Sequence, residues 1–194
     1  MDTNESWEYF LNPKNLRQNL ISFALFITNF EMLKSAVVDR IRDFYSIGFD
    51  DSGDRHSPNY ERRVLSRHRK VTQASLLWLQ ELGAIDDADI AVFRKLADVR
   101  NDLAHEMLNV LSGQKDIDLQ ARFAELLGLL KKVEVWWVVN VEIATDPAMA
   151  EREIDEDGIV PGSLMISQIL MDVALGDDER ANEYLRKLAE MTKG

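Results

Sequence analysis

The sequence predicts an all-α protein in which four helices form a bundle and a helical hairpin follows at the C-terminus. Apolar residues recur at spacings of three or four over long stretches, which is the period of a helix that buries one face. Only four prolines and nine glycines interrupt the 194 residues, so long uninterrupted elements are expected. No segment shows the strict alternation of apolar and polar residues that is typical of a strand.

The first predicted helix covers residues 13–46. Asn12 is placed to cap its first turn, Pro13 suits the first helical position and Gly48 suits the end. Its apolar positions are Leu16, Leu20, Phe23, Ile27, Phe30, Val37, Ile41 and Phe44. Residues 47–58 are rich in Gly, Asp and Ser and are predicted to form a loop.

Two further helices are expected in the middle of the chain. One runs over about 59–82 and ends at Gly83. The next opens at Asp86 and Asp87, where acidic residues favour a helix N-terminus, and continues to about Leu111.

A fourth helix is predicted over about 116–143, and two short helices over about 163–175 and 177–192. The acidic segment between them contains Asp-Gly and Pro-Gly pairs and is predicted to be a linker. The chain is thus expected to divide into a helical domain (1–146), an acidic linker (147–162) and a C-terminal helical extension (163–194).

The composition of the chain excludes several classes of function. The chain has no cysteine, which excludes disulfides, thiolate metal sites and a cysteine nucleophile. Its N-terminus is acidic and polar, unlike a signal peptide, and the apolar stretch 133–144 is too short to span a bilayer. A cytoplasmic protein without membrane contact, metal or cofactor is expected. The net charge of −11 means that nucleic-acid binding would need a local basic patch.

Helical geometry sorts the third helix into faces, since successive residues rotate by roughly 100°. The expected core stripe is Val92, Leu96, Val99, Leu103 and Val110. A flank of small and apolar residues would let a helix of this chain or of a second copy approach closely, namely Phe93, Ala97, Ala104 and Leu108. A polar strip contains Arg94, Asp98, Asn101 and His105. Arg100 lies roughly 140° from His105, so the two meet only on an irregular helix, through a substrate or across two subunits.

Residues 96–105 read Leu-Ala-Asp-Val-Arg-Asn-Asp-Leu-Ala-His. This string resembles the signature of the HEPN superfamily, in which an arginine and a following polar residue precede a histidine by a short spacer. Arg100, Asn101 and His105 match it, with four residues between the arginine and the histidine. The resemblance covers about residues 65–110. A looser resemblance connects the chain with the mannitol-operon repressor family of helical regulators.

The resemblance implies a HEPN-like bundle that forms a homodimer with the motif helices facing each other. Many members are metal-independent endoribonucleases of toxin–antitoxin, phage-defence or RNA-processing systems, and others are inactive regulatory or protein-interaction modules. It implies catalytic roles for Arg100, Asn101 and His105, with Glu31 as a candidate supporting residue. We therefore expect an endoribonuclease. One alternative is an inactive regulator of the same fold that binds an antitoxin or another protein. The other is a helical protein in which the motif serves only packing.

These residue types suit the chemistry of RNA cleavage. A histidine titrates near neutrality and can transfer the proton of a 2′-hydroxyl or of a leaving 5′-oxygen. An arginine offers a fixed charge and a fork of donors to phosphate oxygens. Asn101, one turn before His105, could orient the ring or bind a substrate oxygen. One histidine per chain is little for acid–base catalysis, which favours a dimer, and the expected product is a 2′,3′-cyclic phosphate.

A local reversal of charge occurs between Tyr60 and Lys70. This segment contains one acidic residue, Glu61, and six basic residues: Arg62, Arg63, Arg67, His68, Arg69 and Lys70. The segment is a candidate RNA-binding surface. Alternatively, these cations pair with acidic residues on adjacent helices or on a partner.

Two other groups are weaker candidates. Trp136 and Trp137 could stack on bases, although adjacent tryptophans in an apolar helix more often pack in a core. His56 lies near three acids, Asp50, Asp51 and Asp54. A single histidine in a Gly/Ser-rich loop is not expected to form a metal site.

Overall fold

The computed structural model describes residues 7–8, 10–50, 53–149 and 154–192. Helix makes up 75% of the residues and strand 5%, so the expectation of a mostly helical chain is confirmed. The elements are α2 (Pro13–Phe44), β1 (Ser46–Asp50), β2 (Gly53–His56), α3 (Pro58–Arg63), η1 (Leu65–Arg67), α4 (Val71–Glu81), α5 (Asp87–His105), α6 (Met107–Leu111), α7 (Leu119–Trp137), η2 (Val138–Ile143), α8 (Gly162–Leu175) and α9 (Asp178–Met191).

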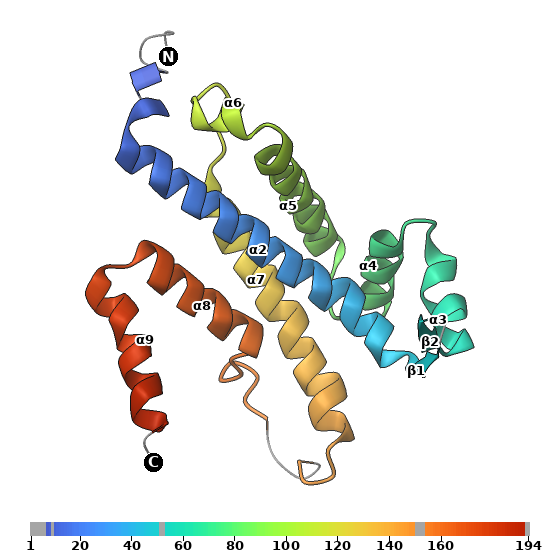
Figure 1. The fold of residues 1–194 in the computed structure, drawn as a ribbon. Coiled ribbons are helices and arrows are strands. Elements are labelled where there is room, and N and C mark those ends of the chain that lie inside the picture. Colours follow the sequence, from blue (N-terminus) through green and yellow to red (C-terminus); the bar gives the residue numbers. More distant parts are fainter. Residues whose placement is uncertain (1–6, 9, 51–52, 150–153, 193–194) are drawn as a thin grey trace.

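α2 is the central helix, and α4, α5, α7 and α8 all pack against it (Figure 1). It begins as predicted, because the side chain of Asn12 accepts hydrogen bonds from the backbone N–H groups of Lys14 (3.0 Å) and Asn15 (3.3 Å), and Pro13 follows. Its buried apolar residues form one face: Phe23, Leu25, Phe26, Phe30, Leu33, Ala36, Val37 and Ile41.

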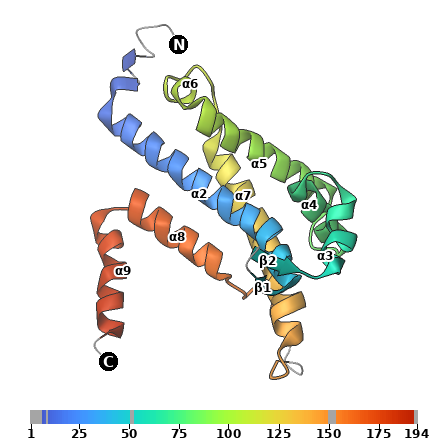
Figure 2. The same ribbon diagram turned by 45° about the vertical axis from the view of Figure 1, so that its right-hand side comes forward.

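α5 and α7 complete the core beside α2, and Figure 2 shows the three helices side by side. The start of α5 is also as predicted: Asp86 and Asp89 form a reciprocal capping box at its N-terminus. Phe93 of α5 packs on Phe30 of α2 with ring centroids 5.6 Å apart. Leu96 and Leu103, which the sequence placed on the core stripe, are fully buried.

Two helices, α8 and α9, follow the acidic segment; α8 packs on α2 and α7, and α9 packs on α8. A buried polar pair joins α8 to the core: the hydroxyl of Ser167 donates to the side-chain oxygen of Asn29, whose amide donates to the carbonyl of Leu25 at 2.8 Å. Asp172 of α8 accepts from the Tyr184 hydroxyl at 2.7 Å and lies 3.2 Å from Arg180 Nε, which fixes the start of α9.

The expectation of a loop without strands over 47–58 is wrong. β1 and β2 form an antiparallel hairpin in which Phe49 pairs with Asp54. The strands lie on the surface, with Phe49 87% exposed, so they have no buried face to impose the alternation by which a strand is recognised. Gly48 and Gly53 take positive φ angles of 124° and 114°, which other residues rarely adopt.

The predicted helix over 59–82 is broken into α3, η1 and α4. An unbroken helix would stack Arg63 and Arg67 at the i, i+4 spacing, where like charges are unfavourable. Side chains also compete for the helix carbonyls, since the Ser66 hydroxyl donates to the Arg62 carbonyl and Arg67 Nε donates to that of Arg63. The chain is then extended at His68 and Lys70 before α4 begins.

The third helix does not continue to Leu111. α5 ends at His105, Glu106 leaves the helical conformation and α6 is a separate short helix. Lys115 contacts the carboxylates of both Asp102 (2.7 Å) and Glu106 (3.1 Å) and so stabilises the break. The rotation after the break buries Leu111, which did not belong to the predicted stripe.

α2 is the one helix in the described part of the chain that is long and apolar enough to cross a bilayer, with a mean hydropathy of 1.4 over 18 residues. The sequence interpretation had singled out residues 133–144 instead. Of the window in α2, 44% is buried inside the protein, and four helices pack on α2. A core helix meets the same criteria of length and composition, and the contacts of α2 are those of a core helix.

Candidate functional site

Arg100 lies on the side of α5 that faces α2, where it forms an ion pair with Glu31. Its Nε and Nη2 atoms donate to the same carboxylate oxygen at 3.1 and 2.8 Å, and Nη1 is outside this pair. Lys34 contacts the other oxygen at 3.3 Å. Glu31 is thus positioned beside Arg100, as its candidate supporting role requires, and two cations around one carboxylate leave a net positive charge.

The electrostatics of this cluster favour an ionised Glu31. Partial burial acts to raise the pKa of Glu31, but hydrogen bonds and charges from Arg100 and Lys34 outweigh it and hold the pKa below that of an ordinary glutamate. The guanidinium of Arg100 therefore has a fixed, charged partner throughout the neutral pH range.

Asn101 and His105 lie on a different face of α5, and both are exposed. Within the described residues, neither side chain makes a hydrogen bond or ion pair. His105 is the last residue of α5. An exposed ring without a hydrogen bond or ion pair contributes little to stability, which weakens the interpretation that the motif serves only packing.

Two acidic residues near His105 are partly compensated by one lysine of the same chain. Asp102 and Glu106 share Lys115. The hydrogen bond from Lys115 to Asp102 is the main cause that raises the pKa of Lys115, whereas burial acts to lower it. A phosphate that approached His105 would meet one net negative charge from this cluster rather than two. The end of α5 is therefore less repulsive to an anion than its sequence suggests.

One chain does not bring Arg100 and His105 together on one face. Arg100 is held between α5 and α2, while Asn101 and His105 point to solvent, which agrees with the separation expected from helical geometry. The close-packing flank is also split: Phe93 belongs to the core, whereas Leu108 is 70% exposed. The partner of Phe93 is within the chain, and Ala104 and Leu108 remain accessible.

The basic segment 60–70 divides into cations that are used within the chain and cations that are not. Arg62 donates to Asn59 at 2.6 Å, and Arg67 forms an ion pair with Glu81, whose pKa is lowered chiefly by that hydrogen bond. Arg63 is exposed and adds to the positive field at Glu81. The segment was interpreted either as an RNA-binding surface or as a set of cations that pair with acidic residues. The second interpretation holds for Arg67.

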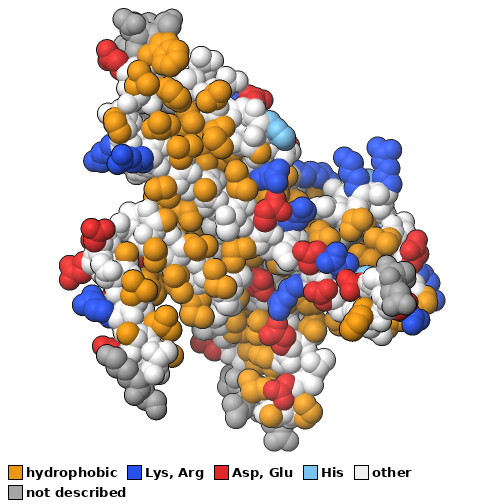
Figure 3. Space-filling model, in the orientation of Figure 1, with side chains coloured by type: hydrophobic (Ala, Val, Ile, Leu, Met, Phe, Trp, Pro, Cys, Tyr) orange, Lys and Arg blue, Asp and Glu red, His pale blue; other side chains and the backbone are white. Residues whose placement is uncertain are grey.

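Arg69 and Lys70 instead line an open pocket of about 540 Å³ between the start of α4 and α5. The sequence interpretation did not place Gln73, Leu77 and Arg94 at this surface, but the structure does. Figure 3 shows Lys and Arg side chains gathered at the end of the molecule that α3 and α4 form. Helical spacing placed Arg94 on the polar strip of α5. Its proximity to Gln73 depends on where α4 lies in the fold and could not be predicted from that spacing.

The tryptophan pair is divided between core and surface. Trp137 is 3% exposed, its Nε1 donates to the Ala36 carbonyl at 3.0 Å, and it stacks on Trp78 at 6.1 Å. It cannot offer a face to a base. Trp136 is half-buried and lines a pocket of about 370 Å³ beside Lys131 and Asn140.

His56 does not gather ligands around it in the described part of the chain. Its ring lies 5.2 Å from that of Tyr60, and no group of three His, Asp or Glu residues suited to a metal ion is found among the described residues. Asp51, one of the acids considered with it, lies outside them.

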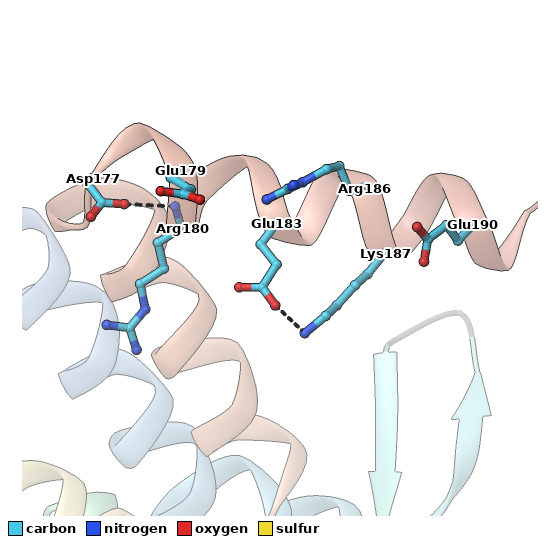
Figure 4. Close-up of a pocket in the computed structure, with 7 residues that line it drawn as sticks. All are labelled: Asp177, Glu179, Arg180, Glu183, Arg186, Lys187 and Glu190. Carbon is cyan, nitrogen blue, oxygen red and sulfur yellow. Dashed lines mark hydrogen bonds and ion pairs between the residues drawn. The ribbon is translucent and has the colours of Figure 1, made fainter.

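A second charged surface lies on α9. Figure 4 shows its seven lining side chains, and Glu183 points to Lys187, with which it pairs at 2.7 Å. They are Asp177, Glu179, Arg180, Glu183, Arg186, Lys187 and Glu190. Because they follow one another along a single helix with mixed charge, the surface is that of a solvated helix face rather than a convergent site.

Comparison of the chain with protein-family models, with curated proteins and with solved structures found no match. The resemblance to the HEPN superfamily therefore depends on the motif of α5 and its helical surroundings.

Replacing Glu31 by Gln is expected to lower the free energy of unfolding at pH 7 by about 0.2–1 kcal/mol, because the pair with Arg100 is partly exposed and screened. The folded-state pKa of Glu31 is depressed, so its contribution is present above the unfolded pKa and is lost as the pH falls through the folded pKa. Urea unfolding should separate wild type and Glu31→Gln at pH 7, and the difference should shrink as the pH is lowered towards about 3 and Glu31 becomes protonated. Asp98→Asn, an exposed change on α5, is the control, and an equal gap at both pH values would contradict the assignment.

Proposed function

We propose that this chain is a metal-independent endoribonuclease of HEPN type that acts in the cytoplasm as a homodimer. The observation that carries the proposal is the exposure of two motif residues that have no partner in the described part of the chain. Asn101 and His105 are exposed on one face of α5 and unused within the described chain, while Glu31 fixes Arg100 at the adjoining edge. An RNA-cleaving toxin or phage-defence component that is restrained by a protein partner fits this class.

The proposed reaction is an internal transesterification. The 2′-oxygen forms a bond to the adjacent phosphorus, the bond from phosphorus to the 5′-oxygen breaks, and the products carry a 2′,3′-cyclic phosphate and a 5′-hydroxyl. A base removes the proton of the 2′-hydroxyl, and an acid returns a proton to the 5′-oxygen. A neutral His105 serves the first role and a protonated one the second.

The two proton transfers are the physical reason for a dimer. One motif histidine per chain supplies one of the two roles, and a second copy of α5 facing the first supplies the other. Arg100 offers its charge to the phosphorane, with Nη1 outside the pair with Glu31. Asn101, one turn before His105, offers an amide that can orient the imidazole or hold a substrate oxygen.

The test is incubation of the purified chain with single-stranded RNA in EDTA, followed by analysis of the RNA ends. We expect fragments with 2′,3′-cyclic phosphate ends, and activity per chain that falls when dilution dissociates the dimer. Identical RNA profiles for wild type and the double variant Arg100→Ala/His105→Ala would refute the enzymatic function.

The second candidate is a catalytically inactive regulator or protein-interaction module. It is favoured by an apolar surface on the C-terminal hairpin, where Leu185 is 65%, Leu188 59% and Met191 80% exposed (Figure 3). This function predicts a stable complex with another protein and no RNA cleavage. Substitution of His105 should then leave the complex intact.

A further inference from the structure

The pocket between α4 and α5 gathers positive charge without a balancing carboxylate. Three permanent cations, Arg69, Lys70 and Arg94, line it together with His68, Gln73 and Leu77. No acidic residue is among these six, although the chain has 34 acidic residues and a net charge of −11. Such a concentration of like charge costs free energy in the free protein and is offset when an anion binds.

The side chains of Arg69 and Lys70 are available to an anion. Both are exposed, and within the described residues neither forms an ion pair or a side-chain hydrogen bond. Their neighbour Arg67 differs, because Glu81 already compensates its charge. The basic segment thus contributes two unpaired cations, Arg69 and Lys70, to this pocket.

Arg94 is oriented without losing its charge. One of its terminal nitrogens donates to the side-chain oxygen of Gln73 at 2.9 Å. An amide oxygen is a neutral acceptor, so it holds the guanidinium in place and leaves the full positive charge for a ligand. Gln73 is therefore a positioning residue for Arg94.

His68 and the helix end add neutral donors. The backbone N–H of Lys70 donates to His68 Nδ1 at 3.0 Å, so in the neutral ring Nε2 carries the proton and is a donor. α4 starts directly after Lys70 with no side-chain cap, which leaves N–H groups of its first turn open to an external acceptor. Cations and N–H donors around one hollow match the oxygen atoms of a phosphate.

The pocket also lies on the face of α5 that carries the candidate catalytic side chains. Arg94, Asn101 and His105 share the polar strip, and Arg94 and His105 are eleven positions apart, which corresponds to roughly 16 Å of helix. An RNA strand bound along this face would contact both the basic pocket and the motif residues Asn101 and His105.

We propose that this pocket binds a backbone phosphate of the RNA strand at a distance from the bond that is cleaved. The inference rests on the proposed function, since it takes RNA as the source of the phosphate. It assigns RNA contact to His68, Arg69, Lys70 and Arg94, and it removes Arg62 and Arg67 from the direct contacts. The pocket then sets the register of the strand and contributes to affinity rather than to proton transfer.

The experiment measures binding of a fluorescent single-stranded 2′-O-methyl RNA, which lacks the attacking hydroxyl, to wild type and variants over a range of salt concentrations. Arg94→Gln and Lys70→Gln should each weaken binding about tenfold, as loss of a hydrogen bond to a charged group implies. Each should also reduce the slope of log affinity against log salt by about 0.7, the value for one phosphate contact on a single strand. Arg186→Gln removes the same charge on α9 and should change neither quantity (Figure 4).

The outcomes separate the two proposals. If Arg94→Gln and Lys70→Gln bind like Arg186→Gln, the pocket assignment fails, whatever the cleavage assay shows. If the chain binds but does not cut unmodified RNA, the enzymatic function fails and the pocket stands. Calorimetric titration with inorganic phosphate is the second measurement. Phosphate binding that Arg94→Gln abolishes, with RNA affinity unaltered, would overturn RNA as the ligand.

Discussion

Replacing His105 by Ala is expected to reduce cleavage of single-stranded RNA by a factor of about 10² to 10⁴, the contribution of a positioned proton donor or acceptor. The melting temperature should not change, because the ring is exposed and makes no hydrogen bond within the described residues. Rates measured at saturating RNA separate this effect from binding, since His105 lies roughly 16 Å along α5 from the basic pocket.

Asp98→Ala is the matched control for this variant. Asp98 is exposed on the same strip of α5, so its removal should leave the cleavage rate within a few-fold of wild type. Full activity of His105→Ala would contradict the catalytic assignment. A fall in melting temperature that accounts for the lost activity would instead give His105 a structural role.

The parts of the fold that the sequence predicted well are set by local chemistry. Asn12 with Pro13, and Asp86 with its capping partner Asp89, begin helices through hydrogen bonds to residues within one turn. The long apolar period of α2 fixes its buried face in the same way. Such features need no knowledge of the rest of the chain.

The errors arose where tertiary contacts or exposed strands decide the structure. The break between α5 and α6 is stabilised by Lys115, which reaches back nine residues to Glu106 and thirteen to Asp102. The hairpin of β1 and β2 is exposed along its length and has no apolar alternation to reveal it.

In the candidate site, too, the features set by one helix could be predicted and those set by tertiary contacts could not. The angular separation of Arg100 from His105 follows from the period of one helix and could be predicted, whereas the pairing of Arg100 with Glu31 joins residues 69 positions apart. Helical spacing predicted only that Arg94 belongs to the polar strip of α5. Its place in a basic pocket depends on Gln73, 21 positions earlier on α4, and no local pattern encodes that proximity.

Replacing Trp137 by Ala is expected to lower the free energy of unfolding by about 3–5 kcal/mol, the usual cost of removing a buried tryptophan from a core. The side chain stacks on Trp78 at 6.1 Å, and the guanidinium of Arg40 lies 5.7 Å from its ring centre. Its loss also leaves the buried carbonyl of Ala36 without the indole donor. Chemical unfolding followed by circular dichroism measures the change.

Trp136→Ala provides the comparison, since it deletes the same side chain one position earlier. Trp136 is half-buried and packs edge-on against Trp78 at 6.2 Å, so its removal should cost about 1–2 kcal/mol. The difference between the two variants measures how α7 directs one indole into the bundle and the next towards the surface. Equal losses, or a larger loss for Trp136→Ala, would show that the helix is rotated relative to α2 and that the placement of Trp137 under Ala36 is wrong.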